Sequence, residues 1–109
     1  MTEAPLQINV LDLAQLREDG TPHTLLDVRE APEVQTCAIA GSLWIPMQEI
    51  PARLDELPRD QPIVVLCHLG GRSMRVTGFL RQNGFANASN LAGGIDAWAQ
   101  MVEPGMPRY

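Results

Sequence analysis

The 109-residue chain has a formal net charge of −5, and 45% of its residues are hydrophobic while 19% are charged. This balance is typical of a globular protein, so we expect a single domain over residues 1–109. The acidic charge argues against nucleic acid and against an anionic membrane surface as main partners. No apolar run approaches the ~20 residues of a membrane span and no secretory signal opens the sequence, which favours a cytoplasmic protein.

Hydrophobic patterning along the first half of the chain predicts short strands that alternate with short helices. Apolar residues at 11, 13, 14 and 16, with charges between them, predict a helix that Gly20 ends. Pro51 suits the first turn of a helix, where its missing N–H has no partner to lose. The predicted strands are 6–10, 24–28 and 42–45, and the predicted helices are 11–18, 29–36 and 51–57.

The second half of the chain continues this alternation. The β-branched run at 63–66 predicts a buried strand, and 72–82 is the clearest helix. A last strand is predicted at 88–91, and the pair Gly93-Gly94 opens a last helix. The alternation predicts an α/β fold whose parallel sheet has helices on both faces. The apolar face of the helix at 72–82 consists of Met74, Val76, Phe79 and Leu80.

The loop after the strand at 63–66 carries the pattern that points to chemistry. Cys67 stands at the carboxyl end of that strand, and Gly70 and Gly71 can adopt positive φ and bring backbone N–H groups close to a ligand. A helix N-terminus and nearby cations lower a thiol pKa from ~8.5 to ~3.5–7.5. Cations in a first helical turn oppose the helix dipole, so an anion resting between Arg72 and Arg75 would account for both. We interpret Cys67 as a nucleophile rather than a small buried core residue.

Other candidate residues have a structural alternative beside the functional one. His68 either tunes the Cys67 thiol or points into solvent, and Arg75 either contacts substrate or is a solvated helix charge. Asp27 and Arg29 lie at the edge of the sheet where ligands bind, and we favour an ion pair that holds the following loop. No cation flanks Cys37 in the sequence, so we favour a structural role over that of a resolving cysteine. We expect neither a metal nor a cofactor.

The segment Cys-His-Leu-Gly-Gly-Arg-Ser at 67–73 resembles the active loop of single-domain rhodaneses, which are thiosulfate sulfurtransferases. Residues 25–30, 43–46 and 90–98 are similar to the second-strand, third-strand and closing motifs of that family. The resemblance implies a three-layer α/β sandwich around a mostly parallel five-stranded sheet. The chain departs from the family at 37–42, where Cys-Ala-Ile-Ala-Gly-Ser replaces the common Gly-His-Ile-Pro-Gly-Ala.

The resemblance also implies a reaction, with 67–72 as the catalytic loop. Cys67 would attack the outer sulfur of thiosulfate, sulfite would leave, and Arg72 would neutralise the departing oxyanion. Cyanide, a small thiol or a protein thiol would then remove the sulfur from the Cys67 persulfide. The residues implied to bind the substrate and the persulfide are His68, Leu69, Gly70, Gly71 and Ser73.

Two other functions remain open at this point. Phosphatases and arsenate reductases on related folds place five residues between cysteine and arginine, whereas four separate Cys67 from Arg72 here. The shorter loop favours a pocket fitted to a single sulfur atom. A non-catalytic persulfide carrier or interaction module is the other alternative.

Overall fold

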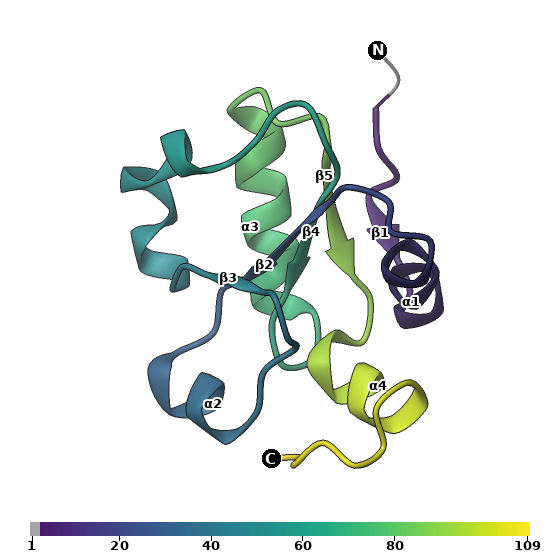
Figure 1. The fold of residues 1–109 in the computed structure, drawn as a ribbon. Coiled ribbons are helices and arrows are strands. Elements are labelled where there is room, and N and C mark those ends of the chain that lie inside the picture. Colours follow the sequence, from purple (N-terminus) through teal and green to yellow (C-terminus); the bar gives the residue numbers. More distant parts are fainter. Residues whose placement is uncertain (1–2) are drawn as a thin grey trace.

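The computed structural model describes residues 3–109 and contains a central sheet flanked by helices (Figure 1). The five strands described are all parallel and lie in the order β1-β5-β4-β2-β3. The predicted α/β architecture with a parallel five-stranded sheet is therefore confirmed. The strands are β1 (Gln7–Ile8), β2 (Thr24–Asp27), β3 (Leu43–Trp44), β4 (Ile63–Leu66) and β5 (Ala88–Leu91).

Residues 3–109 also form four α-helices and two 3₁₀ helices, of which the last α-helix follows the last strand. Pro32 lies in the first turn of its helix, where a proline leaves no backbone hydrogen bond unmade. The α-helices are α1 (Val10–Glu18), α2 (Ala31–Thr36), α3 (Gly71–Gln82) and α4 (Gly94–Met101), and the 3₁₀ helices are η1 (Met47–Ala52) and η2 (Leu54–Glu56).

The prediction of an α-helix over 51–57 is wrong. Pro51 lies inside η1 and not in the first turn of a helix. Its missing N–H and its ring are incompatible with a continuous α-helical ladder. The chain instead makes short-range bonds, such as those from Arg53 N to the Ile50 carbonyl (3.0 Å) and from Leu57 N to the Leu54 carbonyl (3.1 Å).

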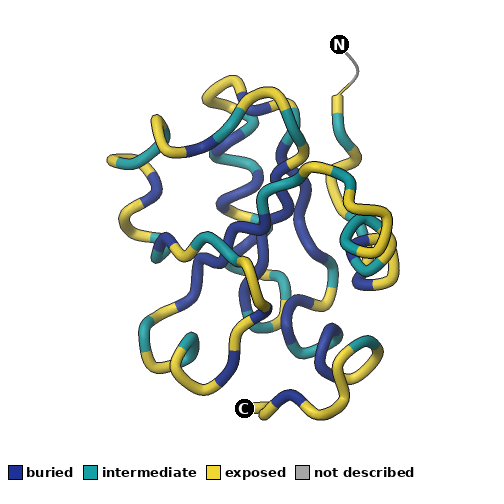
Figure 2. Tube along the Cα trace, in the orientation of Figure 1, coloured by how far each residue is buried: buried dark blue, intermediate teal, exposed yellow. Residues whose placement is uncertain are grey.

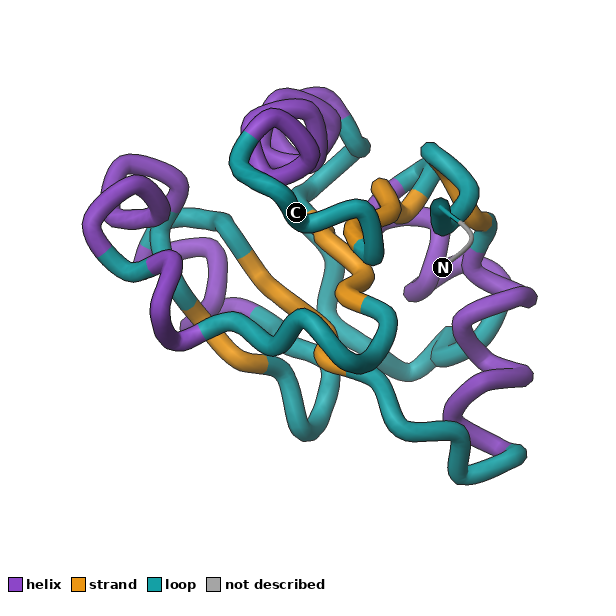
Figure 3. The backbone as a smooth tube through the Cα atoms, turned by 90° about the horizontal axis from the view of Figure 1, so that it is seen from above, coloured by secondary structure: helices purple, strands orange, loops and turns teal. Residues whose placement is uncertain are grey.

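The sheet separates two hydrophobic clusters. Buried positions gather along its central strands (Figure 2), and Figure 3 shows the strands with the helices around them. Val64 and Leu66 of β4 pack with residues of α1 and α4. Ile63 and Val65, the alternate positions, pack with residues of α3 and η1. Because β4 is covered on both sides, its whole sequence is apolar. Helices therefore lie on both faces of the sheet, as predicted.

The buried face of α3 differs from the predicted one. Met74 and Phe79 are only half-buried, whereas Ser73 and Thr77 are fully buried beside Val76 and Leu80. Burial of these hydroxyls is possible because each has a partner: Thr77 Oγ1 donates to the Ser73 carbonyl at 2.8 Å, and Ser73 Oγ lies 2.5 Å from Asn90 Oδ1.

Candidate active site

The loops that follow β2, β4 and β5 meet at the carboxyl edge of the sheet, as expected for parallel strands. Cys67 follows β4 directly and lines a hollow of about 340 Å³ with five other residues. It is nevertheless only 1% exposed. The other residues that line the hollow are His68, Leu69, Gly71, Arg72 and Arg75.

Three donors point at the sulfur atom of Cys67. The backbone N–H groups of Gly70 and Ser73 lie 3.1 and 3.4 Å from Sγ, and the Ser73 hydroxyl lies 3.3 Å from it. Gly70 adopts a φ of 111°, which turns the loop into α3. Gly71 is the first residue of α3 and has no positive φ, so of the two glycines that can adopt this conformation only Gly70 does so.

These donors determine the protonation of Cys67. Burial by itself raises the pKa of the thiol, because a thiolate is less well solvated inside the protein. The Ser73 hydroxyl, the backbone N–H groups of Ser73 and Gly70, and the charge of Arg72 act in the opposite direction. Their combined effect lowers the pKa of Cys67 below its ordinary value. The lowered pKa raises the fraction of the thiolate, which is the nucleophilic form.

Ser73 connects Cys67 to a polar chain that crosses to β1. Its hydroxyl lies 2.5 Å from Asn90 Oδ1, and Asn90 Nδ2 donates to Gln7 Oε1 at 3.1 Å. One hydroxyl proton cannot serve both Asn90 and Cys67. Hydrogen bonds to charged acceptors are stronger than those to neutral ones, so ionisation of Cys67 would favour the bond from the Ser73 hydroxyl to the sulfur over the bond to Asn90.

The N-terminus of α4 holds the loop at 67–72 from the other side. The backbone N–H groups of Ile95 and Asp96 donate to the carbonyls of Cys67 (2.9 Å) and His68 (3.1 Å). Gly94, at φ +60°, lies so close to these two carbonyls that a β-carbon would not fit. The predicted helix-entry role of Gly93-Gly94 is confirmed, and Gly94 also allows close contact with the loop.

Arg72 already has a carboxylate partner. Its Nη1 and Nη2 atoms donate to the two oxygens of Glu33 at 2.7 and 2.8 Å. The hydrogen bonds from Arg72 are the main reason that the pKa of Glu33 falls to about 2. Arg72 lines the hollow above Cys67. From the sequence we expected an anion between Arg72 and Arg75, but the guanidinium of Arg72 is paired with Glu33.

Asp27 and Arg29 form the predicted ion pair, and both are fully buried. Arg29 Nη2 lies 2.7 Å from Asp27 Oδ2 and also donates to the Cys37 carbonyl at 2.8 Å. Arg29 Nη1 lies 3.9 Å from the sulfur of Cys37. The prediction that no cation flanks Cys37 is therefore wrong. Arg29 is eight residues away in the sequence, but the fold brings its guanidinium next to the Cys37 sulfur. Cys37 and Cys67 pack on opposite faces of the sheet, and both are free thiols.

His68 does not point into solvent. Its ring stacks on that of Tyr109 with the centroids 4.1 Å apart. Its Nε2 atom is buried and has no hydrogen-bond partner among residues 3–109, the Asp96 carboxylate being 4.0 Å away. Leu69, the next residue of the loop, is 63% exposed and forms part of the rim.

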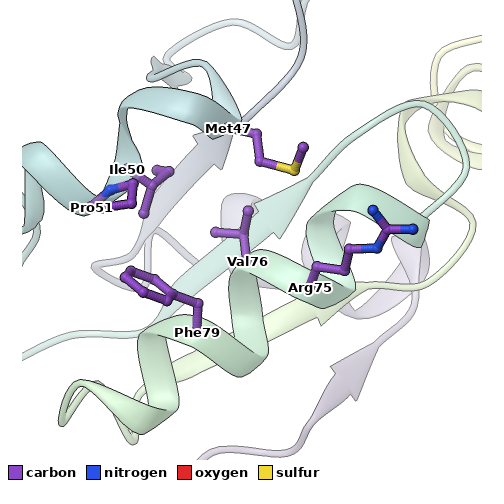
Figure 4. A pocket seen from close by; sticks show the side chains of 6 residues that line it. All are labelled: Met47, Ile50, Pro51, Arg75, Val76 and Phe79. Carbon is purple, nitrogen blue, oxygen red and sulfur yellow. The ribbon is translucent and has the colours of Figure 1, made fainter.

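Arg75 lies between the hollow above Cys67 and a second, apolar groove (Figure 4). The groove has a volume of about 180 Å³ and runs between η1 and α3. Figure 4 shows the guanidinium of Arg75 turned away from Phe79. Arg75 is exposed and lines the hollow. Both predicted roles, a substrate contact and a solvated helix charge, are compatible with this position. The other residues lining the groove are Met47, Ile50, Pro51, Val76 and Phe79.

Three residues of the site were missed from the sequence. Glu33 and Asn90 lie in segments whose pattern indicates only a helix and a strand. Tyr109 lies 80 residues from Arg29, yet its hydroxyl accepts a bond from Arg29 Nη1 at 3.1 Å and donates to Glu33 Oε2 at 2.7 Å. Glu33 could have been found by asking which carboxylate offsets Arg72, since an arginine beside a buried site needs a partner.

Two further features of residues 3–109 bear on the site. These residues contain no group of three or more His, Cys, Asp or Glu side chains placed to hold a metal ion. None of the helices described combines the length and the apolar character of a segment that could cross a bilayer.

Known proteins share this fold. Residues 9–101 match the rhodanese-like domain family. The chain is 36% identical over 94 residues to a sulfurtransferase of Allochromatium vinosum, covering 86% of this chain and 88% of that protein. It superposes on the human single-domain sulfurtransferase TSTD1 with a TM-score of 0.81 and 26% identity, covering 90% of this chain and 98% of that one. The chain belongs to the rhodanese-like family of sulfurtransferases.

Some relatives are much longer than this chain. It is 40% identical over 110 residues to the adenylyltransferase and sulfurtransferase MOCS3-2 of Zea mays. That match covers 94% of this chain and 23% of the maize protein. The chain thus spans about a quarter of the length of this relative.

Proposed function

We propose that the protein transfers sulfane sulfur from a small donor to a thiophilic acceptor through a persulfide on Cys67. The observation that supports this most is the set of three hydrogen-bond donors on a buried sulfur whose pKa is lowered. Membership of a sulfurtransferase family adds to it. A structural cysteine would need none of these donors.

The first half-reaction takes thiosulfate as donor. The Cys67 thiolate attacks the outer sulfur, a new S–S bond forms, and the bond between the outer and central sulfur atoms breaks with its electron pair passing to sulfite. The enzyme is left with the Cys67 persulfide anion, so charge and atoms balance without an outside oxidant. The backbone N–H groups of Gly70 and Ser73 are placed to stabilise that anion, as donors do in oxyanion holes.

The second half-reaction returns the enzyme to its thiolate. Cyanide takes the outer sulfur and leaves as thiocyanate, or a thiol takes it and becomes a persulfide while its proton moves to the transferred sulfur. Arg72 interacts with the anionic donor, and His68, Leu69 and Gly71 form the walls of the hollow that receives it. Because both cysteines are free thiols, we assign this ping-pong reaction to a reducing cytoplasm.

Alternative functions make different demands on the same loop. A phosphatase or arsenate reductase needs room for a tetrahedral oxyanion, and the four residues between Cys67 and Arg72 favour a single sulfur atom. A carrier would hold the same persulfide and pass it to a protein thiol. That possibility is attractive because the maize relative combines a sulfurtransferase with an adenylyltransferase in one name.

Intact-mass measurement after treatment with thiosulfate tests the proposal. We expect a gain of one sulfur atom in the wild type and in Cys37→Ser, which is the matched control, and no gain in Cys67→Ser. Cyanide should remove the added sulfur and release an equal amount of thiocyanate. Release of phosphate from an aryl phosphate, without any thiocyanate from thiosulfate, would reverse the assignment. Loading of Cys67 with discharge only to a protein thiol would favour the carrier.

A further inference from the structure

The guanidinium that should receive the donor's negative charge is already neutralised. Arg72 Nη1 and Nη2 each donate to one oxygen of Glu33, at 2.7 and 2.8 Å, in a forked arrangement. Both side chains are largely buried, with 31% of Arg72 and 18% of Glu33 exposed. The pair is therefore screened by solvent less than a surface ion pair. An anion that approaches Arg72 also approaches the Glu33 carboxylate.

Glu33 is held in place independently of Arg72. The Tyr109 hydroxyl donates to Oε2 at 2.7 Å, and the Glu30 backbone N–H donates to Oε1 at 3.1 Å. Tyr109 is itself fixed, since its hydroxyl accepts a bond from the buried Arg29 and its ring stacks on His68. If Arg72 turned toward a substrate, Glu33 would keep these two bonds and stay at the edge of the hollow.

The rest of the surroundings does not restore the lost positive charge. Arg75 lines the same hollow, but it is exposed, and water and salt screen its charge. Asp96, beside His68, is one more carboxylate at this edge of the sheet, and its charge is offset by Arg108, whose Nη2 lies 3.1 Å from Asp96 Oδ1. The chain as a whole carries a formal charge of −5. A dianion thus meets a weaker attraction in this hollow than Arg72 and Arg75 suggest from the sequence.

We propose that Glu33, fixed by Tyr109, is a specificity-determining residue that makes the site prefer a singly charged organic sulfane donor to the thiosulfate dianion. The inference rests on the proposed function, because it concerns the donor that loads Cys67. The Coulomb energy of a substrate beside a fixed charge is proportional to the charge of the substrate. Removing the charge of Glu33 therefore changes the interaction energy of a dianion twice as much as that of a monoanion. The factor by which kcat/KM rises for the dianion is then the square of the factor for the monoanion.

Methanethiosulfonate anion is a suitable probe of this dependence. It transfers its outer sulfur to a thiolate as thiosulfate does, and its leaving group is the methanesulfinate anion instead of sulfite. The wild type should use it with a higher kcat/KM than thiosulfate. In Glu33→Gln, kcat/KM should rise about tenfold for thiosulfate, which corresponds to about 1.4 kcal/mol, and only about threefold for the monoanion.

Two further variants serve as controls. Glu18→Gln changes the net charge equally at an exposed position at the end of α1, and should leave the ratio of the two donors unchanged. Tyr109→Phe keeps the ring on His68 but removes the hydroxyl bond to Glu33, and should shift the ratio toward thiosulfate by less than Glu33→Gln does. An equal loss of kcat/KM for both donors in Glu33→Gln would mean that Glu33 only orients Arg72, and would overturn the inference.

Binding of sulfite tests the same idea without turnover. Calorimetry should show that Cys67→Ser/Glu33→Gln binds sulfite about tenfold more tightly than Cys67→Ser. Equal sulfite affinities of the two variants would refute the role of Glu33 even if Cys67 carries a persulfide. Conversely, tighter sulfite binding together with no sulfur on Cys67 from either donor would keep the role of Glu33 as a determinant of anion binding and refute the proposed transfer.

Discussion

Gly94→Ala should damage both the stability of the protein and the reactivity of Cys67. A β-carbon at position 94 would lie 2.6 Å from the Cys67 carbonyl oxygen and closer still to that of His68. Both neighbours are backbone atoms and cannot move aside as the end of a side chain can. The loop or the start of α4 has to shift, and the bonds from Ile95 and Asp96 to these two carbonyls are then weakened.

The size of the effect follows from two contributions. An alanine at φ +60° costs roughly 1–2 kcal/mol, because its β-carbon is crowded in the left-handed conformation. Each lost backbone hydrogen bond costs about 0.5–1.5 kcal/mol. The free energy of unfolding should therefore fall by about 2–5 kcal/mol. Since the two bonds hold the catalytic loop, loading of Cys67 by thiosulfate should slow by at least about tenfold, by analogy with the loss of one oxyanion-hole donor.

Gly20→Ala provides the matched control. Gly20 has a φ of +68°, close to that of Gly94, but nothing lies within 4 Å of where its β-carbon would be. This variant should lose only the conformational contribution of roughly 1–2 kcal/mol and keep full activity. Urea unfolding of both variants and the initial rate of sulfur loading measure the difference. Equal losses of stability, with normal loading in Gly94→Ala, would refute the argument from close contact.

Three other predictions concern single atoms of the site. Gly71→Ala should leave the free energy of unfolding within ~0.5 kcal/mol of the wild type, because position 71 is helical and open. Gly70→Ala, at φ +111°, should lose roughly 1–2 kcal/mol in urea unfolding, and equal effects of the two substitutions would contradict this. Ser73→Ala should raise the pKa of Cys67, since it removes the hydroxyl donor. Titration of the thiolate absorbance in a Cys37→Ser background should show a higher midpoint. An unchanged midpoint would show that the Ser73 hydroxyl donates to Asn90 and not to the sulfur. Tyr109 is the only tyrosine, so absorbance titration of tyrosinate reports it alone, and burial with its bond to Glu33 should raise its pKa to about 12. The raised pKa stabilises the folded protein fully below the unfolded pKa of ~10, and this stabilisation is lost as the pH rises through 12. A titration midpoint near 10 in the folded protein would contradict the bond from Tyr109 to Glu33.

The parts of the fold that the sequence predicts best are those decided by local pattern. β4 and β5 begin and end at the predicted residues, because both short buried strands are bounded by turn residues that no tertiary contact overrides. The Asp27–Arg29 pair was predictable since the two residues lie close together in the chain. In contrast, the 3₁₀ helices near Pro51 depend on how the proline fits into a segment held between β3 and β4. The spacing of apolar residues in the sequence carries no information about this fit.

Contacts between distant segments set the electrostatics of the site, and these could not be predicted. Arg72 and Glu33 are 39 positions apart, and Tyr109 and Glu33 are 76 apart. Neither pairing leaves a local pattern, since Glu33 serves equally well as an acidic residue in the first turn of α2. Sequence reasoning therefore identified Cys67 and its loop as the candidate site, but it overestimated the free positive charge near the Cys67 hollow.

The burial of Cys67 needs an explanation, because a cysteine that is 1% exposed is usually inert. Desolvation alone would keep this sulfur protonated, and the three donors together with Arg72 reverse that effect. In the persulfide that we propose, the negative charge would lie on an outer sulfur bonded to Sγ. A second sulfur atom needs space beyond Sγ, and the hollow of about 340 Å³ that Cys67 lines offers it. Burial and reactivity are compatible here because the loop supplies the solvation that water would otherwise give.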